Sequence, residues 1–373
     1  MNAPRRSASH SAPRQRGLDG LRTLAVAAVF LFHAQPSLAP GGFFGVTAFF
    51  VLSGYLITGL LLDSLVSRGE VGFIHFWGRR LRRLVPALAV LVVVCVIYSQ
   101  TRLDPPHDHQ NTVDLVRGLL WSSNWFQVAG SVEPLGFANH LWSLAIEAQF
   151  YLLWPLVLWA IWLLSGGRAA AGADRVPGRL VLILGLLTVL AALWRMWLYS
   201  GPDDHRRVYY GLDTNLDGLL LGATWAACRR WSKDVSSRLT VAAGVLAPLA
   251  VATLVWSVVH FRVADGEVFT MGIPLVAVAT LVLVAASARP WGVSVVLQWW
   301  PLVAVGTISY AVYLWHWPTI LILNPYRARW GNNTVVVLEA VVSLALAVLS
   351  WFLIERPAGR VVHRRVASGV RHG

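Results

Sequence analysis

The residues with the clearest catalytic potential lie along the first apolar segment of the chain. Asp19, Arg22 and His33 supply a carboxylate, a guanidinium and an imidazole. On an α-helix, Arg22 and His33 are separated by three turns plus roughly 20°, a distance of about 16 Å, and Asp19 lies within about 40° of the same line. A neutral imidazole is well suited to accept a proton near neutral pH. The spacing predicts a shared face, although an Asp19–Arg22 pair at a membrane interface and a packing His33 are equally open.

A second polar stripe occupies residues 140–151. His140, Ser143, Glu147 and Tyr151 are spaced i, i+3, i+7 and i+11, which places them on one helical face. Interhelical hydrogen bonding can account for Ser and His inside a bundle. A carboxylate in an apolar segment is costly and is by default a functional candidate, so Glu147 is the member of this stripe that is hardest to explain by packing.

Two later segments also carry polar groups among apolar ones. Asp213 and Asp217 are spaced i, i+4, and pairing with arginines for packing explains them as well as function does. Tyr313 and His316 precede a Trp-Pro pair in another apolar run. These positions add candidates for a site formed between helices.

Four arginines fall within five residues, at Arg79, Arg80, Arg82 and Arg83, where an inner loop is expected to end. A charge run of this kind serves as a topology signal that contacts anionic headgroups. Guanidinium groups also suit bidentate recognition of phosphate. Both interpretations predict that the cluster lies at the cytoplasmic face.

The elements that position these residues follow from composition. The chain of 373 residues is 56% hydrophobic and 13% charged, about half the charged share of a soluble domain, which excludes a soluble enzyme. Apolar stretches near twenty residues recur along it and predict an all-α, polytopic membrane bundle. The ten expected spans are 21–36, 43–62, 84–100, 141–164, 180–198, 209–228, 240–259, 268–287, 298–322 and 334–353.

Charge distribution orients these spans. With the N-terminus inside, Lys and Arg are roughly three times as frequent in the inner connections as in the outer ones. Both termini are therefore predicted to be cytoplasmic, with a disordered basic tail at 1–16, a membrane domain at 17–357 and a basic tail at 358–373. The long outer connection, about 101–139, contains an apolar segment at 115–125 that is too short to cross and suits an interfacial or re-entrant position.

Composition and spacing also argue against several functional classes. The excess of positive charge is explained by topology, so no nucleic-acid partner is expected. Cys95 and Cys228 are expected at opposite membrane faces, which excludes a disulfide between them. His107 and His109 lie in a solvated outer loop with no third ligand nearby, so no metal site is expected.

The order of these motifs resembles the acyltransferase-3 family of integral membrane O-acyltransferases. The resemblance covers nearly the whole chain. The chain departs from the usual family pattern at Thr47 and Asn215. It is similar to family members without an extracytoplasmic domain. The matching segments are 17–22 with His33, 45–54, 79–86, 140–151, 213–222, 309–318 and 354–357.

The resemblance implies transfer of an acyl group, often acetyl, from acyl-coenzyme A to a hydroxyl of a carbohydrate or glycosylated natural product. Acyl-coenzyme A is then a co-substrate, and no permanently bound cofactor is expected. The bacterial cytoplasmic membrane is the implied location. His33 is the implied base, with direct transfer and prior acylation of His33 both open. Asp19, Arg22 and Glu147 are the further candidates for the catalytic centre.

Substrate roles are assigned by the same resemblance. The arginines at 79, 80, 82 and 83 are expected to hold the donor phosphates. The residues expected at the acceptor or at a developing oxyanion are His140, Ser143, Tyr313 and His316. A transporter or proton-coupled carrier also places charges inside spans, but internal repeats and broken spans in corresponding halves are not found.

Overall fold

The computed structural model describes residues 15–102, 105–132, 136–170, 172 and 175–358, and within these ranges every regular element is a helix. The predicted all-α class is therefore confirmed. The predicted tails at 1–16 and 358–373 lie almost entirely outside the described residues. The elements, in chain order, are α1 (Arg16–Ala34), α2 (Phe44–Arg68), α3 (Phe73–Arg102), α4 (Pro105–Leu119), α5 (Ser123–Val128), η1 (Asn139–Leu141), α6 (Trp142–Leu164), α7 (Gly167–Ala170), α8 (Gly178–Leu198), η2 (Pro202–Asp204), α9 (His205–Tyr210), η3 (Asp213–Asn215), α10 (Leu216–Trp231), α11 (Lys233–His260), η4 (Val268–Gly272), α12 (Ile273–Ala286), α13 (Val293–Leu297), α14 (Trp300–Thr307), α15 (Ser309–Leu323), η5 (Asn324–Tyr326), α16 (Arg327–Trp330), α17 (Asn332–Ser350) and η6 (Trp351–Glu355).

Within the described residues, eight helical stretches are long and apolar enough to cross a membrane, which confirms a polytopic membrane protein. They are Arg16–Ala34, Phe44–Arg68, Phe73–Thr101, Asn139–Leu164, Gly178–Leu198, Lys233–His260, Val268–Ala286 and Asn332–Ala358. Each of the eight corresponds to one predicted span, with ends that differ by several residues.

The other two predicted spans are each formed by more than one helical element. The span at 209–228 begins as helix α10 only at Leu216, because the backbone is extended at Gly211 and then forms the short η3 turn. The span at 298–322 is divided at Ile308, whose backbone leaves the helical region between α14 and α15. A broken helix leaves backbone groups without intrahelical partners, which is tolerated at membrane depth where protein or a water-filled cavity surrounds them.

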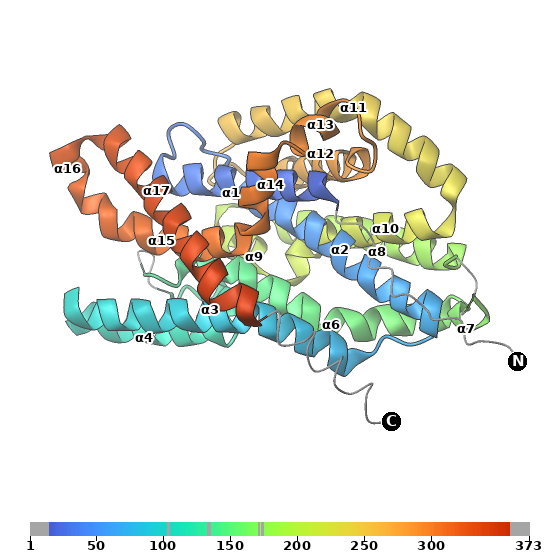
Figure 1. Ribbon diagram of the computed structural model, residues 1–373, viewed down its shortest axis with the longest axis horizontal. Coiled ribbons are helices and arrows are strands. Elements are labelled where there is room, and N and C mark those ends of the chain that lie inside the picture. The colour runs from blue at the N-terminus through green and yellow to red at the C-terminus, as the bar shows by residue number, and fades with distance from the viewer. Residues whose placement is uncertain (1–14, 103–104, 133–135, 171, 173–174, 359–373) are drawn as a thin grey trace, which may run out of the picture.

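Helix α2 lies at the centre of the bundle. In Figure 1 it runs diagonally between α11 and α12 along the upper edge and α3, α4 and α6 along the lower edge. It packs against α10 with almost no space between backbones, because a Cβ atom added at Gly54 would lie 1.8 Å from the Leu219 carbonyl oxygen, and one at Gly222 would lie 2.1 Å from that of Val51. Small residues at such crossings let membrane helices approach closely.

Helix α1 is held by neighbours on several sides, α2, α14 and α15 among them. A Cβ atom at Gly306 of α14 would lie only 1.8 Å from the carbonyl oxygen of Asp19, so the end of α14 is fixed against the start of α1. This contact places the α14–α15 break beside Asp19 and Arg22. The residues with catalytic potential on α1 therefore face elements from the C-terminal third of the chain.

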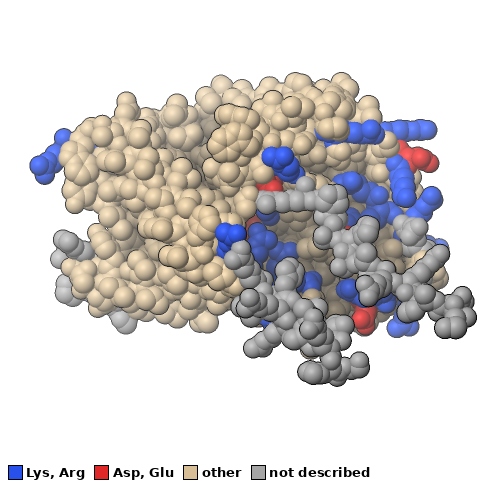
Figure 2. Space-filling model, in the orientation of Figure 1, with Lys and Arg blue, Asp and Glu red and all other residues tan. Residues whose placement is uncertain are grey.

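The two ends of the described chain lie on one side of the bundle, since Gln15 and Arg356 line the same pocket. An even number of crossings is required for that arrangement. Figure 2 shows Lys and Arg gathered over the half of the visible face that contains α7 in Figure 1, while the opposite half is almost free of them apart from its tip. This distribution agrees with the predicted inner side.

The predicted interfacial segment at 115–125 is not one continuous element. Its first part completes α4, which packs against α3, and its last part begins α5. Asn111 of α4 accepts a hydrogen bond from the backbone N–H of Phe137 at 3.1 Å. Residues from this outer connection thus support the chain where it enters η1 and α6.

Candidate active site

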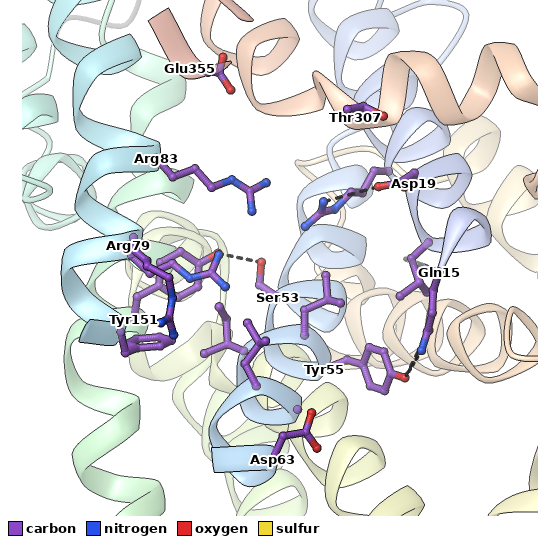
Figure 3. A pocket seen from close by; sticks show the side chains of 18 of the residues that line it. Gln15, Asp19, Ser53, Tyr55, Asp63, Arg79, Arg83, Tyr151, Thr307 and Glu355 are labelled. Carbon is purple, nitrogen blue, oxygen red and sulfur yellow. Dashed lines mark hydrogen bonds and ion pairs between the residues drawn. The ribbon is translucent and has the colours of Figure 1, made fainter. Parts of the chain in front are cut away.

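A pocket of about 710 Å³ opens at the end of the bundle where Gln15 and Arg356 lie (Figure 3). Its walls come from α1, α2, α3, α6, α10, α14 and η6, so distant parts of the sequence meet there. A smaller pocket of about 70 Å³ adjoins it and reaches Ser143 and Tyr313. The two pockets share Arg22, Ser53, Arg80, Arg83 and Tyr151. Together they lead from the arginine-rich end into the bundle.

The four clustered arginines all line the larger pocket. The sequence predicted these arginines at the end of a loop. They lie within a helix instead, because α3 already begins at Phe73. Their spacing on a helix, i, i+3 and i+4, brings side chains of successive turns to neighbouring positions. In Figure 3, Arg83 extends from α3 across the pocket toward α1. The helical setting therefore aims the cluster at the cavity more rigidly than a loop would.

The positive charge on this wall is not held in close ion pairs. Within the described part of the chain, none of the four guanidinium groups forms an ion pair with a carboxylate. Arg80 lies 5.6 Å from the ring centroid of Tyr151 and 5.7 Å from that of Phe76. Arginines without acidic partners that converge on a cavity are suited to bind an anion with several oxygen atoms.

Asp19 and Arg22 form the wall of the pocket on the side of α1. Their charged groups are 3.9 Å apart, and the Arg22 side chain is 20% exposed. Both residues line the larger pocket, whereas His33, farther along the same helix, lines neither pocket. The predicted stripe is thus divided between the pocket and a second cluster deeper in the bundle.

Glu147 is the centre of a hydrogen-bonded group between the two pockets. Its Oε1 accepts from Ser53 Oγ at 2.9 Å, and its Oε2 accepts from Tyr151 OH at 2.7 Å. Ser53 Oγ and Tyr151 OH are also within 3.0 Å of each other. A half-buried carboxylate held by two hydroxyls in this way has a fixed orientation. The arrangement joins α2 to α6 beside the arginines.

Ser143 and Tyr313 meet at the inner end of the smaller pocket. Tyr313 OH donates to the carbonyl oxygen of His140 at 2.9 Å, and Ser143 Oγ lies 2.6 Å from Tyr313 OH. Because the tyrosine proton is used on the carbonyl, the serine hydroxyl is the donor in the second bond. This contact connects α6 to α15 between the pocket and the histidines.

Three imidazoles lie beyond that contact. His33 Nδ1 is 3.0 Å from His316 Nε2, and their ring centroids are 5.1 Å apart. His140 lies against His316 with a centroid separation of 5.5 Å, and its Nε2 is 3.2 Å from the carbonyl oxygen of Leu314. Trp317 covers His33 at 4.8 Å. His33, His140 and His316, from three separate segments of the chain, therefore form one cluster, which we call the histidine cluster.

The two aspartates of the predicted sixth span have arginine partners. Asp217 is 2.5 Å from Arg195 NH1, and the Arg195 side chain is fully buried and also donates to the Phe269 and Thr214 carbonyl oxygens. Asp213 pairs with Arg207 at 2.6 Å. Of the two roles left open for these residues, this geometry favours packing.

The two departures from the usual family pattern lie close to these pairs. Asn215 donates its amide to the Tyr209 and Gly211 carbonyl oxygens and so fixes the turn before α10. Thr47 is buried in α2, and its backbone faces Gly218 of α10. Both substitutions therefore belong to the α2–α10 region.

Several pocket residues were missed as site candidates. Each of them carries a polar group and lies on a pocket wall. Most of them fall within or next to the motifs already recognised, so the sequence contained a signal for them. The added residues are Ser53, Tyr151, Tyr310, Arg230, Glu355 and Arg356. Arg230 had no such signal, since its partner Asp63 is far away in sequence. In the structure, Arg230 Nε lies 2.6 Å from Asp63 Oδ1.

Among the residues that the structure describes, no three His, Cys, Asp or Glu side chains are placed to share one ion. The side chains of His107 and His109 are not among those described.

Comparisons with known proteins give the chain a family. The acyltransferase domain family, acyltransferase 3, matches residues 15–356. A putative peptidoglycan O-acetyltransferase, YrhL, of Bacillus subtilis is 35% identical over 91% of this chain and 54% of its own length. The O-acetyltransferase OatA of Staphylococcus aureus is 33% identical over 91% of this chain and 56% of its own. The peptidoglycan O-acetyltransferase OatA of Listeria monocytogenes is 33% identical over 95% and 57%.

The chain thus spans a little over half the length of these curated relatives. None of the solved structures matches it. The family match extends over nearly the whole chain, including all the helices that carry the pocket and the histidine cluster. The predicted family is confirmed: the chain belongs to the acyltransferase-3 family.

Proposed function

We propose that this protein is a membrane O-acyltransferase that moves an acyl group, acetyl above all, from acyl-coenzyme A to a hydroxyl of a carbohydrate. A cell-surface glycan or a glycosylated natural product is the acceptor, and the names of the relatives make peptidoglycan the first glycan to test. The observation that carries the proposal is a pocket that leads toward the histidine cluster and is lined by four arginines of α3 that form no ion pair with any described residue. The site of action is the bacterial cytoplasmic membrane.

The donor enters from the arginine-rich end. Arg79, Arg80, Arg82 and Arg83 hold its phosphates, because planar guanidinium groups form paired hydrogen bonds with phosphate oxygens. Arg22 contributes at the opposite wall. The flexible arm that carries the thioester then follows the smaller pocket toward Ser143 and Tyr313. Donor binding of this kind needs no resident cofactor.

His33 acts as the general base. Its imidazole takes the proton of the acceptor hydroxyl while the hydroxyl oxygen forms a bond to the thioester carbonyl carbon. Collapse of the tetrahedral intermediate breaks the carbon–sulfur bond, and the proton passes from the imidazole to the leaving thiolate. If His33 is acylated first, the acyl group is transferred twice, from the thioester to the imidazole and then to the acceptor hydroxyl, and the same products form. Asp19, Arg22 and Glu147 supply the electrostatic setting on the donor side.

Ser143, Tyr313 and His140 serve the acceptor or the developing oxyanion. A continuous set of contacts lies where the smaller pocket ends. Tyr313 contacts Ser143, His140 and His316, and His140 also contacts His316. Hydroxyl and imidazole donors stabilise a tetrahedral oxyanion when they are fixed before the reaction. Opening of the Ser143–Tyr313 contact is required for the thioester to reach His33.

The first experiment measures release of free thiol by purified protein in detergent. Acetyl-, propionyl- and longer acyl-coenzyme A are supplied with and without a panel of sugars and glycan fragments. We expect acceptor-dependent release that His33→Gln abolishes. His260→Gln is the matched control, because His260 is exposed at the end of α11. Folded protein that releases no thiol with any donor would overturn the proposal and favour a carrier.

Arginine variants test the donor site separately. In Arg80→Gln/Arg83→Gln the KM for the acyl donor should rise at least tenfold, with little change in the KM for the acceptor, because two phosphate contacts are lost. Arg238→Gln is the control, since Arg238 is exposed on α11 and lines neither pocket. Equal increases in both KM values would contradict the assignment.

A further inference from the structure

We propose that His316 is a positioning residue that fixes the tautomer of His33, so that Nε2 of His33 is the atom that carries out the chemistry. The inference rests on the proposed function for the identity of the base, but its structural part stands on the hydrogen bonds of the histidine cluster alone. It gives His316 a role in orienting the base in place of contact with the acceptor.

The direction of the hydrogen bonds starts at the backbone of α15. His316 Nδ1 lies 2.6 Å from the carbonyl oxygen of Tyr313. A carbonyl oxygen only accepts, so Nδ1 of His316 must carry the proton. In the neutral ring the other nitrogen, Nε2, then has the free lone pair. The helix that contains His316 therefore sets the tautomer of that side chain.

The same reasoning gives the tautomer of His33. Nε2 of His316 is 3.0 Å from Nδ1 of His33. Since Nε2 of His316 is the acceptor, Nδ1 of His33 must be the donor and carries the proton. Nε2 of a neutral His33 is left with its lone pair. This is the state that a base or a nucleophile needs.

The surroundings hold this arrangement in place. His316 is fully buried, and His140, Tyr313 and His33 all lie against its ring. His140 has no free proton to compete, because its Nε2 donates to the Leu314 carbonyl and its Nδ1 has no partner among the described residues. Within the described chain no carboxylate forms an ion pair with any of the three rings.

A neutral partner has a distinct consequence for catalysis. When His33 takes the acceptor proton on Nε2, its Nδ1–H becomes a stronger donor, and the lone pair of His316 stabilises the imidazolium without a formal charge. An orienting aspartate does the same with a full negative charge in other enzymes. Here the proton bound to Nδ1 of His33 stays in place throughout the cycle.

Two substitutions at position 316 separate this role from simple packing. Glutamine places its amide group where Nε2 of histidine lies and can offer an oxygen to Nδ1 of His33. Asparagine reaches only the position of Nδ1, so it can satisfy the Tyr313 carbonyl but leaves His33 without an acceptor. We expect His316→Gln to keep kcat within about tenfold of the wild type, and His316→Asn to lower it by ~10²–10⁴-fold, the range known for loss of groups that orient imidazoles.

The tautomer itself is measured by solid-state NMR of protein labelled with ¹⁵N-histidine in lipid, in which His33→Gln identifies the His33 signals. We expect Nδ1 of His33 to be protonated and Nε2 unprotonated, a pattern that persists in His316→Gln and becomes mixed in His316→Asn. The inference is overturned if Nε2 of His33 carries the proton in the wild type, or if the two variants lose equal activity. Retained activity in His33→Gln would instead overturn the proposed base, whatever the tautomer.

Discussion

At the scale of single residues, the charged side chains of this bundle divide by whether they have partners. Arg195 with Asp217 is a buried pair, and Arg327 pairs at 2.8 Å with the fully buried Glu339. The arginines of α3 face the pocket without such partners. Burial of a charge is tolerated when it is paired, whereas the pocket arginines of α3 are exposed or half-buried and keep their donors available to an external anion. This contrast distinguishes the paired charges inside the bundle from the charges that we propose to bind the donor.

The Arg195–Asp217 pair gives a stability prediction. Asp217→Ala leaves the fully buried guanidinium without its partner, and we expect a loss of about 3–5 kcal/mol in the free energy of unfolding. Asp63→Ala removes a pair in which the carboxylate side chain is 58% exposed and should cost less than about 1 kcal/mol. Thermal unfolding in detergent measures both. Equal losses would show that burial does not distinguish the two pairs.

Sequence reasoning identified most of the polar residues but not their partners. The helical spacing of Asp19 and Arg22 correctly indicated a common side, and Ser143 and Glu147 both reach the smaller pocket. The contact between His33 and His316 spans 283 residues. Periodicity describes one helix at a time, so such a contact follows only from how helices pack.

At the scale of elements, the close crossing of α2 and α10 is the feature that fixes the larger pocket. Ser53 and Tyr55 on α2 and Arg230 on α10 all line it, so any separation of these helices moves its walls. The sequence indicates the crossing only through the glycines of 218–222. It does not indicate the partner helix, which is why the fold required the structure.

Glycine substitutions test this crossing. A Cβ atom at Gly222 would lie 2.1 Å from the Val51 carbonyl oxygen and 2.7 Å from the Tyr55 nitrogen, so Gly222→Ala must push the helices apart. We expect a loss of about 1–3 kcal/mol in stability, accompanied by weaker donor binding. Gly185→Ala is the control, because its nearest atom is 4.0 Å away. A Gly222→Ala protein as stable as the control would show that the crossing can relax without cost.

The break between α14 and α15 divides the span that the sequence predicts at 298–322. That segment is mostly apolar despite Thr307, Ser309 and His316, and average hydropathy does not show where a helix breaks. Gly306 packs on the Asp19 carbonyl, and Ile308 turns the chain just beyond it. The helix therefore ends beside this tertiary contact, and there is no proline at the break.

At the scale of the whole molecule, orientation in the membrane decides which compartment supplies the donor. The pocket opens at the end of the bundle where Gln15 and Arg356 lie, and the arginines gather on the same half of the face seen in Figure 2. The count of charges in the sequence predicted this asymmetry without any knowledge of the fold, because it depends on composition of connections and not on packing.

Thiol labelling in intact cells tests the orientation. Ser200→Cys lies between α8 and α9 and should react with a membrane-impermeant reagent, whereas Ser237→Cys near the start of α11 should react only after lysis. Both positions are exposed. The native Cys95 and Cys228 are buried, so the unmodified protein serves as the background. The reverse pattern would place the arginine-rich pocket outside the cell and exclude a cytoplasmic donor.

The depth of the pocket has an electrical consequence. An aqueous cavity that reaches Arg22 and Thr307 carries the potential of the inner solution into the bundle, so more of the membrane voltage falls across the part of the bundle beyond the two pockets. Moving one charge through the full field costs about 2.3 kcal/mol per 100 mV. Donor phosphates held by the arginines stay on the near side of that drop, and the acyl group that passes it is neutral. Transfer across such a barrier draws no energy from the membrane potential and should proceed equally well in de-energised cells.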